Sequence, residues 1–312
     1  MKKLLTQIKP YLRWFIWGGV LFFLIKTVKD RFGEISAIRI NERGWLVLAI
    51  ALAITICAHV WSGWVWTWIL RLFKQSLEVK EGIRVYLVTN IAKYSPGNIW
   101  HYYGRITAVY RAGGSKGAAT LSVLLEPLLM ASAALLIGLI GSGLGLLETN
   151  FNPVIILLQL LSLLAVLTGI HPRILNPWMH RLSRSKNKAD ATAAQSVVLK
   201  SYPLMPFLGE IGFVFLRGCG FLFTFLALQS ISVEQVPQLI SAFSFAWLLG
   251  LVVPGAPGGL GVFEVTAYSL LDDSLFPTEI AAVALYRLIS ILAEAIAAAA
   301  SFDKKRTKRL GD

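Results

Sequence analysis

The sequence predicts an all-α, polytopic integral membrane protein of about eight transmembrane helices. Of its 312 residues, 56% are hydrophobic and only 15% are charged. Several apolar runs reach or approach the ~20 residues that a helix needs to cross the hydrocarbon core. The longest polar stretch, 171–202, is too short to fold by itself. We therefore expect residues 1–312 to form a single transmembrane domain.

The apolar runs give the expected helices in chain order: 10–28, 45–70, 118–146, 151–170, 203–229, 236–254, a short run at 259–271, and 278–302. The first follows a basic start, ends on Lys26 and lacks a cleavage site of small residues, which is typical of an uncleaved signal anchor. Segment 84–110 is too interrupted by polar residues for a simple span and too aromatic for an ordinary loop. We expect it to enter and leave the membrane on the same side.

The distribution of basic residues predicts the orientation in the membrane. Three connections contain no Lys or Arg: 147–150, 230–235 and 272–277. Loop 171–202 and tail 303–312 are rich in both, so the positive-inside rule places them and the N-terminus in the cytoplasm, with the protein in the inner (plasma) membrane. This arrangement requires 259–271 to cross. Loop 29–43 conflicts with it, because its basic residues would lie outside.

Charge and motifs exclude several classes of function. The formal net charge is +13, but the basic residues flank apolar runs and no nucleic-acid-binding motif accompanies them, so anionic lipid headgroups explain them better. Cys57 and Cys219 both fall inside apolar runs, which argues against an exposed structural disulfide. The histidines lack metal-ligand spacing and no ATP-binding motif is present. We expect no cofactor, no nucleic-acid partner and no pump driven by its own nucleotide hydrolysis.

Two Pro-Gly breaks interrupt the apolar pattern, one in each half of the chain. The first is Ser95-Pro96-Gly97-Asn98, and the second spans 254–261 with sequence PGAPGGLG. Such a break frees backbone groups that cannot face lipid, so it must be buried in protein or line a wet cavity. Paired breaks predict a transporter site at the interface of inverted repeats. The alternative is that each break is a loop at the membrane surface.

The breaks also carry a resemblance to a known family. The stretch Ala92-Lys93-Tyr94-Ser95-Pro96-Gly97-Asn98-Ile99-Trp100, followed by Gly104-Arg105, resembles the first signature of the lysylphosphatidylglycerol synthase transmembrane, or flippase-like, family. Residues 257–264 resemble the second signature. The resemblance implies movement of lipids between leaflets. Some members add a cytosolic aminoacyltransferase domain; this chain ends at Asp312, so the resemblance implies the translocation half without synthase activity.

Ionisable residues within apolar runs are costly and usually functional. At ~1.5 Å rise per residue, Arg217 and Arg287 lie about 21–22 Å from the cytoplasmic ends of their helices. Glu126, Glu210 and Glu294 lie about 10–14 Å deep. Each arginine is seven residues from a glutamate on its own helix, about 10 Å along the axis, which disfavours pairing within the helix. The arginines therefore either grip a phosphate in a shared cavity or form ion pairs between helices, and the sequence supports both equally.

The second break should start a short helix at 261–271. Glu264 in its first turn would favour the helix dipole and counter an arginine when no lipid is bound. His59 is better explained as a packed or hydrogen-bonded histidine than as a proton relay. The candidate substrate-binding residues are Lys93, Tyr94, Pro96, Gly97, Asn98, Arg105, Glu126, Glu210, Arg217, Pro257, Gly258, Gly259, Gly261, Glu264, Arg287 and Glu294.

The sequence thus predicts a flippase or transporter for a phospholipid or another lipid-linked anionic headgroup, with membrane lipids as partners and no enzymatic turnover. Two alternatives remain: a membrane enzyme or enzyme subunit that modifies lipid headgroups, and a small-solute transporter. The sequence leaves open which lipid is moved, the energy source, and whether the chain forms a homo-oligomer.

Overall fold

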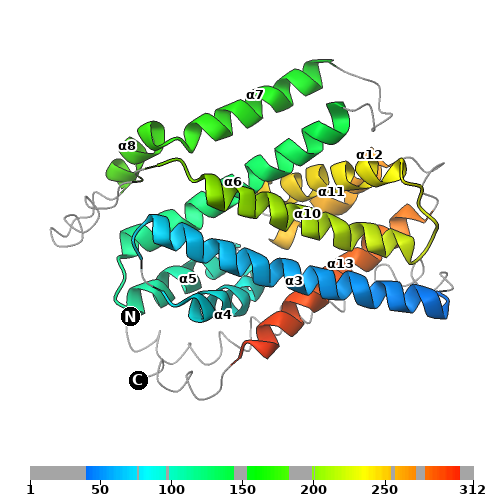
Figure 1. The fold of residues 1–312 in the computed structure, drawn as a ribbon, viewed down its shortest axis with the longest axis horizontal. Helices are drawn as coiled ribbons and strands as arrows, with labels where there is room; N and C mark the ends of the chain where they lie inside the picture. The colour runs from blue at the N-terminus through cyan, green and yellow to red at the C-terminus, as the bar shows by residue number, and fades with distance from the viewer. Residues whose placement is uncertain are drawn as a thin grey trace.

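The computed structural model describes residues 40–75, 77–95, 98–143, 153–182, 199, 201–253, 257–271 and 278–302. All regular elements within these residues are helices (Figure 1). In chain order they are α3 Glu42–Leu72, α4 Val79–Asn90, η1 Ile91–Tyr94, α5 Trp100–Arg111, α6 Lys116–Gly143, α7 Pro153–Gly169, α8 Pro172–Leu182, α10 Leu204–Leu226, α11 Gln235–Val252, η2 Pro257–Gly259, α12 Val262–Leu270 and α13 Glu279–Ala300.

Five of the described helices are long and apolar enough to cross a membrane: α3, α6, α10, α11 and α13. Each coincides with an apolar run in the sequence, so the helical class and the multi-pass character are confirmed. The run at 151–170 forms α7, whose apolar part is shorter than these spans. The run at 10–28 lies outside the described residues.

The run at 259–271 differs from its expected role. It forms α12, a helix of only 9 residues. Such a helix is about 14 Å long, less than half the ~30 Å thickness of the hydrocarbon core. It packs beside α11, as Figure 1 shows at the right of the bundle. Gly259 and Gly261 stand at the start of this run, so the helix begins only at Val262 and too few residues remain for a full span.

Segment 84–110 is also not a simple span. It folds into α4, the one-turn η1 and α5, with a break at 95–99 between η1 and α5. α4 packs against α3 and α13, while α5 packs against α6. Five of its polar and aromatic residues are therefore buried against the long helices, namely Tyr86, Asn90, Tyr94, His101 and Arg105, whereas Tyr103 and Tyr110 remain exposed.

Close backbone approach holds the long helices together. α3 and α10 lie side by side along much of their length (Figure 1). A Cβ on Gly220 of α10 would lie 2.5 Å from Thr55 Oγ1 of α3. A Cβ on Gly138 of α6 would lie 2.6 Å from the Phe245 ring of α11. Glycine is required at both positions, in keeping with the small residues that bring membrane helices together.

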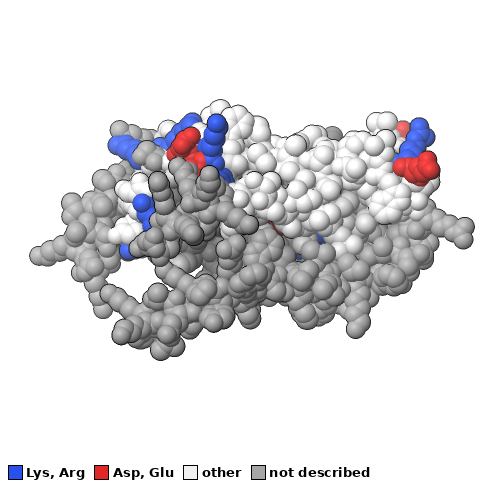
Figure 2. All heavy atoms as spheres, turned by 90° about the horizontal axis from the view of Figure 1, so that it is seen from below, with Lys and Arg blue, Asp and Glu red and all other residues white. Residues whose placement is uncertain are grey.

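The surface has the charge distribution of a membrane protein. Figure 2 shows one face on which the charged side chains of the described residues gather at the two ends. A broad band of uncharged residues separates them. α7 adds an exposed apolar face, with Leu157, Leu161 and Leu164 each more than half exposed. These leucines would contact lipid in a bilayer.

Candidate functional site

A polar cavity lies where the two breaks of the chain meet. η1 and η2 contact each other, and η1 also contacts α13. The cavity has a volume of about 120 Å³ and is open on one side. Ten of the sixteen candidate residues line it: Lys93, Tyr94, Asn98, Arg105, Glu126, Arg217, Gly258, Gly259, Arg287 and Glu294. Residues from both halves of the sequence thus line one cavity.

The second break is a run of left-handed backbone. Gly258, Gly259 and Gly261 have φ values of 60°, 74° and 84°, which L side chains rarely adopt. A Cβ on Gly258 would lie 2.6 Å from the Tyr94 ring, and a Cβ on Gly259 would lie 3.0 Å from the Gly250 backbone. The chain therefore turns inside the bundle and packs directly on the first break. Pro257 begins this turn.

The short helix expected after this break is confirmed. Gly261 is its N-cap, and the Gly261 N–H donates to Glu264 Oε2 at 2.7 Å. The carboxylate thereby satisfies a backbone donor that the helix itself leaves open. The other Glu264 oxygen accepts from Arg287 Nε at 2.7 Å, so Glu264 does counter an arginine.

The first break is described in part, because Pro96 and Gly97 lie outside the described residues. On either side of them, Tyr94 and Asn98 line the cavity. Asn98 has φ 49°, one of the few positive values outside glycine. Its side-chain Oδ1 is buried and lacks a hydrogen-bond partner among the described residues. The break thus presents a polar acceptor toward the site.

The buried charges pair between elements and not within their own helices. Arg105 on α5 contacts Glu126 on α6 at 2.6 Å. Lys93 on η1 contacts Glu294 on α13 at 2.6 Å. Arg287 contacts Glu264 as described above, and its NH2 also donates to the Gly258 carbonyl at 3.0 Å. These pairs follow from the helical geometry, since residues seven apart on one helix are separated by about 10 Å along its axis.

Arg217 differs from the other cations. Its guanidinium contacts His59 Nε2 at 3.0 Å and lies 5.4 Å from the Tyr286 ring centroid. Among the described residues, no carboxylate lies within ion-pair distance of it. Its Nε is buried and lacks a partner in the same part of the chain. Arg217 therefore presents a positive charge to the cavity, and no carboxylate of the described residues pairs with it.

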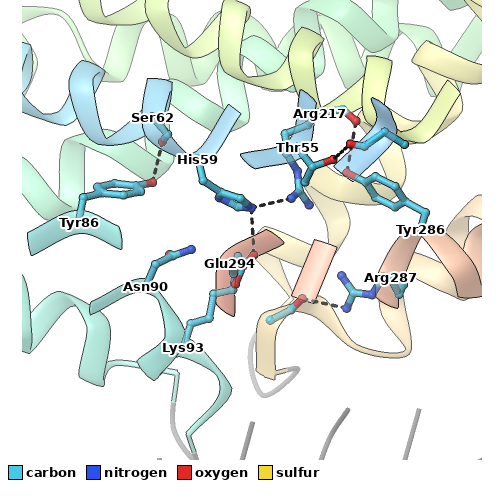
Figure 3. A network of polar contacts seen from close by, with 12 residues as sticks. Thr55, His59, Ser62, Tyr86, Asn90, Lys93, Arg217, Tyr286, Arg287 and Glu294 are labelled. Carbon is cyan, nitrogen blue, oxygen red and sulfur yellow. Dashed lines mark hydrogen bonds and ion pairs between the residues drawn. The ribbon is translucent and has the colours of Figure 1, made fainter. Parts of the chain in front are cut away.

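His59 links this charge to the neighbouring ion pair. His59 Nε2 lies 3.4 Å from Glu294 Oε1, the oxygen that Lys93 also contacts. Figure 3 shows Arg217, His59, Glu294 and Lys93 in an unbroken chain across the cavity. The imidazole is thus hydrogen-bonded, as expected, but it is also part of the site.

Glu210 is a charged candidate residue that, like Glu264, does not line the cavity. Its side chain is fully buried on α10 and is not among the cavity-lining residues. Both carboxyl oxygens lack a hydrogen-bond partner among the described residues. The sequence placed it at the same depth as Glu126, and α10 packs against α6, the helix that carries Glu126.

Several lining residues were not singled out from the sequence: Tyr86, Asn90, His101, Tyr102 and Ser290. Asn90 accepts weakly from Arg105 NH2 at 3.4 Å, and Arg105 stacks 3.7 Å above the Tyr86 ring. The sequence signal for most of them was the mixture of aromatic and polar residues in 84–110. That mixture reflects a helix pair whose polar face is enclosed, and periodicity alone does not separate it from an interfacial segment.

Comparison with known proteins agrees with this picture. No curated protein sequence matches the chain at a significant level. The family model of the lysylphosphatidylglycerol synthase TM region matches residues 15–298, which include both breaks and all the cavity-lining residues. The chain therefore belongs to the family of the lysylphosphatidylglycerol synthase TM region, a family of membrane proteins related to lipid headgroup handling.

Proposed function

We propose that this protein moves an anionic lipid between the leaflets of the inner (plasma) membrane. The headgroup passes through the cavity between η1 and η2, while the acyl chains remain in the bilayer. The lipid is not changed covalently. The cytoplasm holds the basic loop 171–202 and both termini.

The observation that carries this proposal is the buried, unneutralised guanidinium of Arg217. Burial of an ion without a counter-charge is costly. A phosphate entering the cavity would supply that counter-charge and accept paired hydrogen bonds from the planar guanidinium. The two neighbours of Arg217, His59 and Tyr286, hold it in place without removing its charge.

The rest of the lining favours an anion in the same way. Four cationic side chains line the cavity, namely Lys93, Arg105, Arg217 and Arg287, against two lining carboxylates, Glu126 and Glu294. A third carboxylate, Glu264, pairs with Arg287 without lining the cavity, so the site keeps an excess of one positive charge. An excess of one sign in a cleft with low-dielectric walls concentrates ligands of the opposite sign. The described residues therefore match a phosphate-bearing headgroup better than a neutral or cationic one.

Leaflet exchange in liposomes tests the proposal. Purified protein would be reconstituted into phosphatidylcholine vesicles that contain fluorescent phosphatidylglycerol, and a membrane-impermeant quencher would report the lipid in the outer leaflet. We expect the protein to accelerate exchange. Arg217→Gln should slow it by about tenfold or more, because a hydrogen bond to a charged group contributes about 1.5–3 kcal/mol.

Arg71→Gln is the matched control, because Arg71 is exposed at the end of α3 away from the cavity lining. This variant should exchange lipid at the wild-type rate. Equal rates for wild-type protein and empty vesicles would contradict the proposal. A changed headgroup in the recovered lipid would point instead to an enzyme, and flux of a trapped solute to a solute transporter.

A further inference from the structure

We propose that Glu210 and Glu126 form a proton-binding site whose occupancy is coupled, through Arg105, to the anion in the cavity. The proton site stands on the geometry of the described residues. Its coupling to a lipid rests on the function proposed above. The inference names a proton as a second ligand of this protein.

The first observation is the burial of Glu210 without a partner. Its side chain has no exposed surface, and neither carboxyl oxygen accepts a hydrogen bond from a described residue. An ionised carboxylate at this position would lose its hydration, and no hydrogen bond or ion pair from a described residue would replace it. The form compatible with this site is the neutral acid.

The second observation is the charge balance around Glu210. α10 packs against α3, α6, α11 and α13. The ionisable groups whose charges act on Glu210 without contacting its carboxyl are Glu126 on α6, Arg105 on α5 and Tyr86 on α4. On α3, His59 contacts Arg217 and Glu294 instead. α11 carries no ionisable side chain, and the α13 groups Arg287 and Glu294 pair elsewhere. Two carboxyl groups thus share one guanidinium.

With two carboxyl groups and one guanidinium, the Glu126–Glu210 pair needs one bound proton to be electrically neutral together with Arg105. Arg105 is bound to Glu126 at 2.6 Å and has no second carboxylate contact among the described residues. Two interacting carboxyl groups take up protons as a pair, since ionisation of one opposes ionisation of the other. With Arg105 occupied by Glu126, the proton resides on Glu210.

Arg105 connects this pair to the cavity. Arg105 and Glu126 line the cavity, whereas Glu210 lies behind them. A phosphate that takes the guanidinium of Arg105 leaves Glu126 without its partner, and Glu126 then binds a proton from the aqueous phase. Linkage makes the effect reciprocal: protonation of Glu126 releases Arg105 and strengthens anion binding. A proton gradient across the membrane would therefore bias the direction of lipid movement.

Two measurements on the purified full chain test the proposal. Infrared spectroscopy detects the carbonyl band of a buried, protonated carboxyl group; we expect this band in wild-type protein and its loss in Glu210→Gln. The second measurement is proton uptake from a weakly buffered solution when short-chain phosphatidylglycerol is added. We expect uptake by the wild type and its loss in Glu126→Gln. Glu234→Gln, at an exposed position before α11, should behave as the wild type in both.

The outcomes are distinct. Absence of the band from wild-type protein overturns the proton site, and this readout requires neither lipid nor a folded variant. If the band is present and lipid binds without proton uptake, the coupling is overturned. A band without any lipid binding upholds the proton site and contradicts the lipid function proposed above. Loss of both signals in Glu234→Gln would also overturn the assignment to Glu210 and Glu126.

Discussion

Arg287 on α13 and Glu264 in the first turn of α12 form a buried ion pair, with Arg287 Nε 2.7 Å from Glu264 Oε1. The same carboxylate caps α12 through the Gly261 N–H, and the same guanidinium donates to the Gly258 carbonyl. Two side chains therefore hold both Gly258 and Gly261, within the described part of the second break. A ligand anion that takes Arg287 would release both the break and the start of α12.

Loss of one partner of this pair should destabilise the protein more than loss of both. We expect Arg287→Met to lower the free energy of unfolding by about 3–5 kcal/mol, because it leaves the Glu264 charge buried and unpaired. The double variant Arg287→Met, Glu264→Leu should lose less than Arg287→Met alone, because it leaves no buried charge unpaired. Denaturant titration in detergent measures these differences.

Arg84 offers a matched control for this prediction. It pairs with Glu81 at 2.7 Å on the same helix, and both side chains are 21% exposed. Arg84→Met should cost under about 1 kcal/mol, as partly hydrated pairs do. A comparable loss in Arg84→Met and Arg287→Met would show that burial of the Glu264–Arg287 pair has no energetic consequence.

Substitution of Gly259 should abolish transport without preventing insertion. Its φ of 74° and its 3.0 Å approach to the Gly250 backbone leave no room for a side chain. In Gly259→Val the β-branched side chain would force η2 away from α11 and open the cavity wall. Leaflet exchange, normalised to the amount of protein in the vesicles, reports the loss.

Two other glycines distinguish backbone strain from steric clash as the cause of the transport loss expected in Gly259→Val. Gly261 has φ 84° but open space around its Cβ position, so Gly261→Ala should cost only the backbone strain of about 1–2 kcal/mol. Gly169 has neither a positive φ nor a close neighbour, and Gly169→Ala should be silent. If Gly259→Val is well expressed and exchanges lipid at the wild-type rate, the second break is only a loop at the membrane surface and not part of the transport site.

Glu294→Gln should separate binding from turnover. Its carboxylate is the shared partner of Lys93 and His59, beside the unneutralised Arg217. Removal of this charge makes the cavity more positive, so an anionic lipid should bind more tightly and leave more slowly. Quenching of a fluorescent phosphatidylglycerol should show higher affinity, while leaflet exchange becomes slower. Weaker binding by this variant would contradict the anion site.

Cysteine labelling tests the orientation. Val233 is 86% exposed between α10 and α11, and the positive-inside rule places it outside the cell. Val233→Cys should react with a membrane-impermeant maleimide in intact cells. Ser201→Cys, exposed just before α10, should react only after the cells are permeabilised. The reverse pattern would invert the proposed topology.

The sequence by itself determined the class of the protein and the positions of its long helices. Apolar runs such as 45–70 and 278–302 exceed the length that a bilayer requires, and this constraint acts locally on each segment. The same reasoning located the breaks, because proline and glycine change the backbone wherever they occur. The short helix that begins after Gly261 and the place of Glu264 in its first turn followed from neighbouring residues alone, whereas the hydrogen bond from the Gly261 N–H to Glu264 appeared only in the structure.

Only the tertiary structure decided which charges face one another. The depth of Arg217, Arg287 and Glu210 could be counted from the sequence, but the rotation of each helix depends on packing between helices, as at Gly220 and Gly138. That packing pairs Arg287 with Glu264, leaves Arg217 without a carboxylate among the described residues, and buries Glu210 behind the cavity. Five of the eight expected crossings are present among the described residues as helices long and apolar enough to span a membrane, whereas α12, with 9 residues, is too short.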